Sequence, residues 1–170
     1  MQPNKCYAYF ALRGFTMSPD EVSVALGLKA SKSWRAGDSH DAHRIPGKKR
    51  EESHWRVESR IARDAEVPLE DYVKDVLEQL APRFDVAASL SKSHHGLIEV
   101  VGYFHRFYPG LHFEASTLQR MAELGVEIDC DFYYLVPEET EPNQAPLPTP
   151  ISVTPAAGAP VAPATGAAEL

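Results

Sequence analysis

The chain has 170 residues and a formal net charge of -7. That length suits one domain, and the acidic balance excludes the overall positive field that drives non-specific binding to nucleic acid. No stretch approaches the ~18 continuous apolar residues of a membrane span, and the first residues lack the apolar core and cleavage site of an export signal. We therefore expect a cytoplasmic protein without a membrane segment.

Composition divides the chain near residue 136. Residues 1–136 hold all 17 Lys and Arg and 20 of the 24 Asp and Glu, whereas residues 137–170 contain eight Pro, eight Ala and no basic residue. A segment of the latter kind buries too little apolar surface to offset the entropy lost on ordering. The sequence predicts one domain over residues 1–136 and a disordered Pro/Ala-rich tail over residues 137–170.

The predicted domain begins with a strand and a helix. The strand, Lys5–Arg13, is apolar on both faces, which indicates a central position in a sheet. The helix has Ser18 as its N-cap, Pro19 at the first helical position and Glu21 three residues after the cap. Gly27 follows the last apolar residue, where a left-handed residue ends many helices.

Six further segments follow in the predicted domain. Short strands over residues 30–34 and His54–Ser59 flank a polar loop like the arms of a hairpin. The apolar spacing then predicts a helix over Pro68–Leu80 and a strand over Gly96–Phe107. A helix is then predicted over 116–124, with Gln119 in the capping-box position and Leu118, Met121, Ala122 and Leu124 buried. The last predicted strand runs from Val126 to Tyr133.

The predicted element order is β-α-β-β-α-β-α-β. Its first six elements match the split βαβ, ferredoxin-like arrangement, in which the helices pack on one face of an antiparallel sheet. We therefore expect an α+β domain of this class, with an added C-terminal α-β unit.

Four segments carry a resemblance to a known family. They read YAYFALRG in the first strand, SKSWRAGD and HWRVES around the two Trp residues, and LGVEIDCDFYYL at the end. Over residues 5–136 the chain resembles the bacterial domain-of-unknown-function family 4279. The resemblance implies no activity, because none is assigned to that family. The base-rich insertion HRIPGKKREE and the tail depart from its pattern.

One candidate binding surface comprises Trp34, Arg35, Asp38, Trp55 and Arg56. Two Trp rings on flanking strands could hold a planar ligand, or an aromatic side chain, against guanidinium and carboxylate groups. The same residues also suit a structural role, in which both Trp complete the core while Arg35 and Asp38 stabilise the turn.

The second candidate surface is the sheet face with Tyr7, Tyr9 and Tyr133. Some RNA-binding sheets stack bases on strand aromatics, but Asp129 and Asp131 on the same face repel phosphate. We therefore expect a protein partner or a homodimer rather than a small molecule, and nucleic acid is disfavoured.

Histidines and acids offer two further chemistries. Asp38, His40, Asp41 and His43 could supply metal ligands, and Asp129 with Asp131 would suit a hard cation or general acid/base work. A metal needs a pre-shaped ligand set, however, and carboxylates on a strand face are ordinarily solvated. We assign no metal site, no cofactor and no catalytic residue.

The sequence thus favours a small, non-catalytic binding protein that uses the sheet face or the loop between Trp34 and Trp55. A toxin-neutralising or regulatory role would suit such a protein. Two alternatives stay open. One is a metal- or carboxylate-dependent enzyme using Asp129, Asp131 and the loop histidines, and the other is an RNA-binding module.

Overall fold

The computed structural model describes residues 2–40, 47–105 and 110–135. In chain order its elements are β1 (Lys5–Arg13), α1 (Pro19–Leu26), β2 (Lys32–Trp34), β3 (His54–Glu58), α2 (Leu69–Leu80), the 3-10 turn η1 (Ala81–Arg83), α3 (Phe84–Ser93), β4 (His95–Phe104), α4 (Ala115–Leu124) and β5 (Glu127–Tyr134). All of them belong to one unit, Met1–Pro137. The tail predicted over 137–170 lies outside the described residues.

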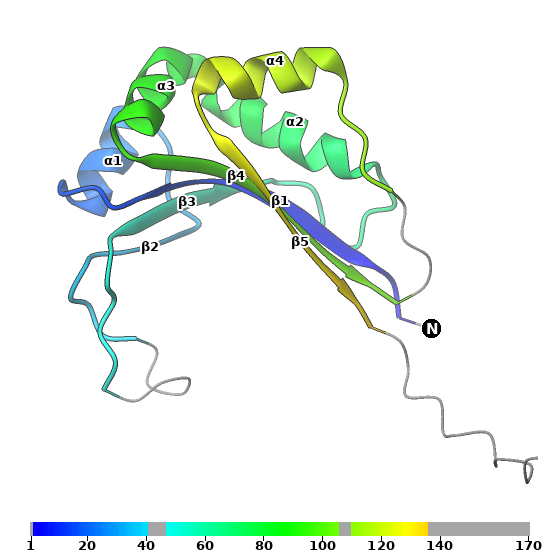
Figure 1. Ribbon diagram of the computed structural model, residues 1–170, viewed down its shortest axis with the longest axis horizontal. Helices are drawn as coiled ribbons and strands as arrows, with labels where there is room; N and C mark the ends of the chain where they lie inside the picture. The colour runs from blue at the N-terminus through cyan, green and yellow to red at the C-terminus, as the bar shows by residue number, and fades with distance from the viewer. Residues whose placement is uncertain (1, 41–46, 106–109, 136–170) are drawn as a thin grey trace, which may run out of the picture. The chain divides into compact units, whose positions relative to one another are not determined.

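The five strands form one sheet in the order β2-β3-β1-β4-β5 (Figure 1). β1 pairs antiparallel with both β3 and β4, and β3 pairs antiparallel with β2. β1 therefore lies inside the sheet, as its two apolar faces predicted.

The expectation of a purely antiparallel sheet is wrong at one edge. β5 runs parallel to β4, with Leu97 opposite Glu127 and Phe104 opposite Tyr134, so the sheet is mixed. The reason is α4, which connects the two strands and returns the chain to the end at which β4 began. Neighbouring parallel strands require such a crossover.

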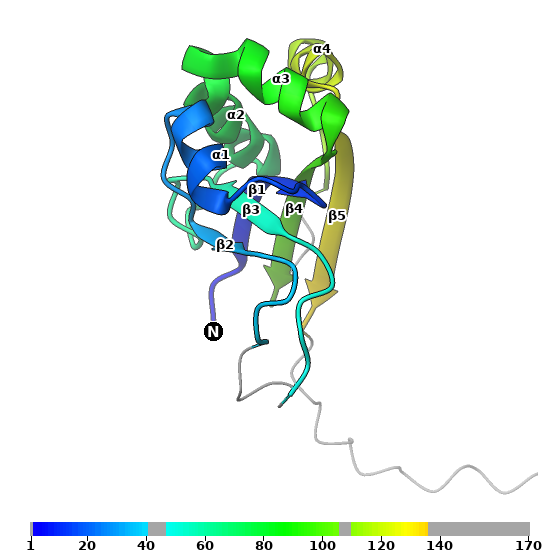
Figure 2. The ribbon, with the colours of Figure 1, turned by 90° about the vertical axis from the view of Figure 1, so that its left-hand side faces the viewer.

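The four described α-helices lie on one face of the sheet, which we call the covered face (Figures 1 and 2). α2 packs on β1 and contributes Tyr72, Val73, Val76 and Leu77, all fully buried. Their three- and four-residue spacing is the one that predicted this helix. The main hydrophobic core thus lies between the helices and the sheet.

The predicted start and end of α1 are confirmed. The Ser18 hydroxyl accepts a bond from the Glu21 N–H at 3.2 Å, and the Glu21 carboxylate accepts one from the Ser18 N–H at 2.7 Å. Gly27 ends the helix with φ +66°, in the left-handed region that glycine tolerates.

Two helices differ from the prediction. α3 was not expected, because only Ala87 and Ser91 on it are buried and its apolar period is weak. α4 begins after Glu114 without a side-chain capping bond, so the capping box expected at Ser116 is wrong, and Gln119 bonds to Glu123 instead. Leu118 and Ala122, expected to be buried, are exposed.

The β2–β3 hairpin extends into the segment predicted to be a loop. The Arg50 N–H donates to the Asp38 carbonyl at 2.8 Å, and the His40 N–H donates to the Lys48 carbonyl at 2.9 Å. Two extended arms therefore continue beyond the sheet. Residues 41–46, which include His43 and Asp41 of the conceivable metal site, lie outside the described part of the chain.

Candidate binding face

The other face of the sheet, which we call the open face, has no described helix over it (Figure 2). Residues paired across neighbouring strands share a face, so the register places the following side chains there. They are Tyr7, Tyr9, Arg13, His54, Arg56, Glu58, Glu99, Tyr103, Asp129, Asp131 and Tyr133. The predicted surface residues Tyr7, Tyr9, Tyr133 and Arg56 are therefore brought to one face.

A small apolar cluster lies on this face, and none of the described helices packs over it. Tyr9, Ala11, Leu97 and Val101 are each at most 5% exposed. The long side chains of neighbouring strands cover them, since such side chains lay their apolar stems over apolar neighbours and keep polar ends in water. The open face is thus apolar beneath a layer of aromatic and charged groups.

Tyr9 belongs to the apolar cluster, and its hydroxyl meets Glu99 in the layer above. The Tyr9 hydroxyl donates to the Glu99 carboxylate, which also lies 3.6 Å from the Arg13 guanidinium. Burial, followed by the bond to Glu99 and its negative charge, raises the pKa of Tyr9 well above its ordinary value. The phenol therefore stays protonated at neutral pH and acts as a hydrogen-bond donor.

Two arginines fix the neighbouring tyrosine rings. The guanidinium carbon of Arg56 lies 4.4 Å from the centre of the Tyr9 ring, and that of Arg63 lies 4.1 Å from the Tyr7 ring. Both guanidinium groups also donate to the Glu58 carboxylate. Each cation is therefore held by a ring and a carboxylate together.

Tyr133 extends the aromatic surface to β5. Its ring stacks on Tyr103 with centroids 5.0 Å apart and 12° between the planes. Tyr133 is 45% exposed. Its ring is therefore both positioned by a neighbour and accessible to a partner.

At the opposite end of this face, Trp34 contacts His54. The two rings are stacked 4.2 Å apart, the Arg50 guanidinium lies 4.0 Å from the Trp34 ring, and the Trp34 indole N–H donates to the Glu52 carbonyl. Burial, followed by nearby positive charges, lowers the pKa of His54 to about 3. These charges belong to Arg13, Arg56, Lys32 and Arg50. His54 is therefore neutral at physiological pH.

The structure does not bring the two Trp rings to one surface. Trp55 is fully buried in the main core, packs edge-on against Phe10, and donates its indole N–H to the Ser23 hydroxyl at 2.9 Å. Trp34 lies on the other side of the sheet, one strand away. Adjacent strand residues point to opposite faces, and this alternation separates Trp55 from the open face.

Arg35 and Asp38 lie together in the exposed hairpin arm. The Arg35 N–H donates to the Asp38 carboxylate at 2.7 Å, and the Asp38 N–H donates to the Arg35 carbonyl at 3.2 Å. Gly37 between them has φ +87°. In this arrangement the carboxylate closes the turn, which is the structural role that the sequence left open.

A family comparison covers nearly all of these elements. The model for a Domain of unknown function (DUF4279) matches residues 4–135. The chain belongs to this family. The match confirms the resemblance carried by the strand motifs and leaves out the Pro/Ala-rich tail.

No curated protein and no solved structure significantly matches the chain. In the part of the chain that the structure describes, no helix has the length and apolar character needed to cross a membrane.

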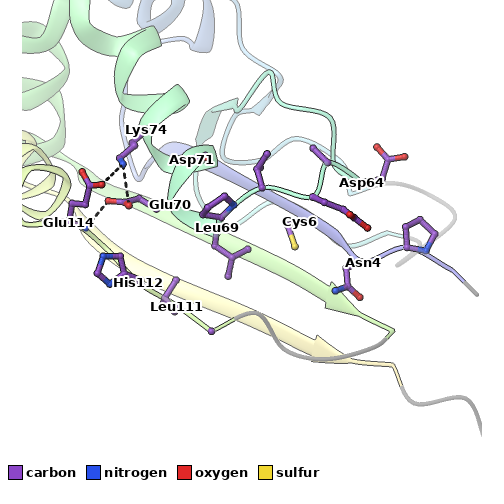
Figure 3. Close-up of a pocket in the computed structure, with 16 residues that line it drawn as sticks. Asn4, Cys6, Asp64, Leu69, Glu70, Asp71, Lys74, Leu111, His112 and Glu114 are labelled. Carbon is purple, nitrogen blue, oxygen red and sulfur yellow. Dashed lines mark hydrogen bonds and ion pairs between the residues drawn. The ribbon is translucent and has the colours of Figure 1, made fainter.

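The DUF4279 domain also contains a cavity of about 810 Å³ near the start of α2 (Figure 3). Sequence reasoning did not single it out. Most of its charged lining is acidic, and Glu70 is the most enclosed of these groups at 5% exposed. The Glu70 carboxylate lies 3.2 Å from the Lys74 ammonium and accepts a bond from the Glu114 N–H at 2.7 Å. Figure 3 marks these interactions with dashed lines.

Glu70 remains a paired carboxylate. Burial raises its pKa, but bonds from Thr117, from the Glu114 N–H and from Lys74 leave it below the ordinary value. The sequence signals were an acid in the first turn of a helix and a Lys four residues later, and both are common features of exposed helices. The Glu114 N–H lies 44 residues away and cannot be recognised from spacing.

Metal-ligating side chains do not converge in the described part of the DUF4279 domain. Within residues 2–40, 47–105 and 110–135, no three His, Cys, Asp or Glu side chains are grouped so as to hold a metal ion. Asp129 and Asp131 lie on β5, whereas His40 lies in the hairpin arm beyond β2.

Proposed function

We propose that this DUF4279 protein is a non-catalytic binding protein that holds a protein partner on the open face of its sheet. The observation that carries the proposal is the apolar cluster of Tyr9, Ala11, Leu97 and Val101, over which no described helix lies and against which Tyr7 and Tyr103 pack. The layer above it includes Tyr and Arg side chains, and these residue types carry much of the binding energy at protein interfaces.

The fixed geometry of the layer supports the proposal. Arg56 and Arg63 are already held by rings and by Glu58, and Tyr133 is already stacked on Tyr103. Side chains ordered before binding lose less conformational entropy when a partner docks. Charges of both signs on the face disfavour the uniformly negative backbone of RNA.

Several finer statements belong to the same proposal. Neutralising a toxin and regulating another protein both require only such a surface, and a second copy of the chain is an alternative occupant. We place the protein in the bacterial cytoplasm, and we treat residues 1–136 as the domain and 137–170 as a disordered tail.

We also propose that β1 to β4 with α1 and α2 form a ferredoxin-like split βαβ unit. The strand order β2-β3-β1-β4, with each neighbour antiparallel, supports this assignment. In this description α4 and β5 are the added C-terminal unit, joined through the parallel β4–β5 pair.

The test is affinity capture from the source cell lysate with three tagged baits. They are the unchanged protein, an open-face variant with Tyr7→Ala and Tyr133→Ala, and a Val24→Ala control on α1, where Val24 is 79% exposed. We expect one stoichiometric partner on the unchanged bait and on the control, and its loss from the open-face variant. Circular dichroism establishes that all three baits are folded.

Two outcomes would contradict the proposal. One is the absence of any stoichiometric partner, combined with a monomeric mass by light scattering. The other is equal retention of the partner by the open-face variant and the control.

A further inference from the structure

β5 forms one edge of the described sheet and borders the open face. The Leu135 N–H donates to the Phe104 carbonyl at 2.8 Å, so the odd-numbered residues of β5 direct their backbone groups toward β4. Backbone groups alternate in direction along a strand. Those of Ile128, Cys130 and Tyr134 therefore point away from β4, and no described strand pairs with them.

The side chains of β5 differ sharply between its two faces. On the open face, Glu127, Asp129 and Asp131 form an acidic row, and the Glu127 side chain is 77% exposed. On the covered face, the apolar side chain of Ile128 is 44% exposed. The edge strand is thus acidic on the open face, and on the covered face it leaves apolar surface partly exposed.

We propose that β5 accepts an extended segment of a protein partner as an additional strand, and that this segment alternates basic and apolar side chains. Strand addition of this kind satisfies backbone groups at a sheet edge, while alternate side chains provide specificity. Basic side chains would lie beside Asp129 and Asp131, and apolar ones beside Ile128 and Cys130. The inference rests on the proposed binding function and specifies the chemistry of its partner.

Charge argues against the two other occupants. In a symmetric pairing of β5 with β5 of a second copy, the acidic rows would lie side by side, and like charges across a strand pair are unfavourable. The chain's own continuation, residues 137–170, contains no Lys or Arg, and its eight Pro lack the N–H that a ladder needs. A segment of another protein with basic residues fits the edge best.

The experiment uses short synthetic peptides of strictly alternating sequence, Lys with Val in one and Glu with Val in the other. Binding is followed by calorimetry and by backbone amide exchange in nuclear magnetic resonance. We expect the Lys peptide to bind and to slow exchange at the amides of Ile128, Cys130 and Tyr134. A Lys peptide that is N-methylated on the groups facing β5 should not bind, because its ladder donors are blocked.

A charge-reversed protein sharpens the test. The double variant Asp129→Lys with Asp131→Lys should bind the Lys peptide about tenfold more weakly and prefer the Glu peptide, because two favourable cross-strand pairs become repulsive. Asp20→Lys with Asp85→Lys is the matched control, since both acids are exposed on helices and the net charge changes equally. The control should retain the preference for the Lys peptide.

Three results would overturn the inference. They are failure of the Lys peptide to bind, binding without slower exchange at Ile128 and Cys130, and slow exchange that depends on protein concentration without peptide, which would assign the edge to a second copy. If any of these results is obtained while the unchanged protein still captures a partner that the open-face variant loses, the proposed function stands and only the strand-addition inference is wrong. If the unchanged protein captures no partner but still binds the Lys peptide, the open face is wrong as the binding surface, and strand addition at β5 stands.

Discussion

The two faces of β1 are buried by different means. Phe10 and Leu12 on the covered face are fully buried beneath helices. Tyr9 and Ala11 on the open face are 5% and 0% exposed, although no described helix lies over them. A sheet face can therefore exclude water with its own tyrosine and arginine side chains, whose stems lie over smaller apolar neighbours.

The difference extends to the chemistry of each layer. The covered face relies on aliphatic and aromatic packing, whereas the open face relies on bonds among Tyr9, Glu99, Arg13 and Arg56. We expect packing changes on the covered face to affect folding most. Changes of charge should act chiefly on the open face.

The largest expected effect is on the covered face. Replacing Leu77, which is fully buried on α2, by Ala should lower the free energy of unfolding by about 2–5 kcal/mol, because it leaves a cavity in the core. Urea denaturation measures the change. Val24→Ala, on an exposed position of α1, is the control and should remain close to the unchanged protein.

A smaller effect is expected on the open face. Glu99→Gln should lower the free energy of unfolding by about 1–3 kcal/mol, because Tyr9 and Arg13 lose a charged partner. It should also lower the pKa of Tyr9, which absorbance titration of the phenols detects. Glu127→Gln on the same face is the control, since that side chain is 77% exposed. Equal losses from both variants would argue against a buried network.

A further prediction concerns the pH dependence of stability. His54 has a folded pKa of about 3 against an ordinary value of 6.5, so the unfolded state binds the proton first as pH falls. Stability should therefore decrease below about pH 6.5, by about 1.4 kcal/mol per pH unit from this group. Urea denaturation at several pH values between neutral pH and about pH 5 measures the slope. Most carboxyl groups titrate below this interval and contribute little to it.

His54→Phe keeps a ring against Trp34 and removes the titrating group. Its stability should depend less on pH in that interval than that of the unchanged protein. His95→Phe is the control, because the His95 side chain is half exposed on the same face. An unchanged slope in the His54 variant would show that this histidine is protonated normally in the folded state.

Local signals in the sequence predicted much of the fold. The Ser18 capping box, the apolar period of α2 and the two apolar faces of β1 each depend on residues close together in the chain. The parallel direction of β5 could not be read in this way, because it follows from the path of α4 across the sheet. α3 was missed because its buried residues are small or polar.

The candidate site was predictable only in part. Alternation placed Tyr7 and Tyr9 on one face of their strand, and Tyr133 on one face of its own. Their charged partners were missed, since Glu99 is 90 positions from Tyr9 and no spacing rule connects the two. Alternation along β3 could have placed Trp55 in the core. Adjacent residues of a strand point to opposite faces, so Trp55 and Arg56 cannot share a surface.

The central place of β1 has a consequence for synthesis. β1 is translated well before its neighbours β3 and β4, and the Tyr9–Glu99 pair joins residues 90 apart. Until then a strand that is apolar on both sides has no native neighbour, which exposes the nascent chain to association with other chains. Assembly of the sheet must wait for β4, so we expect folding to be slower than that of a protein built from local contacts.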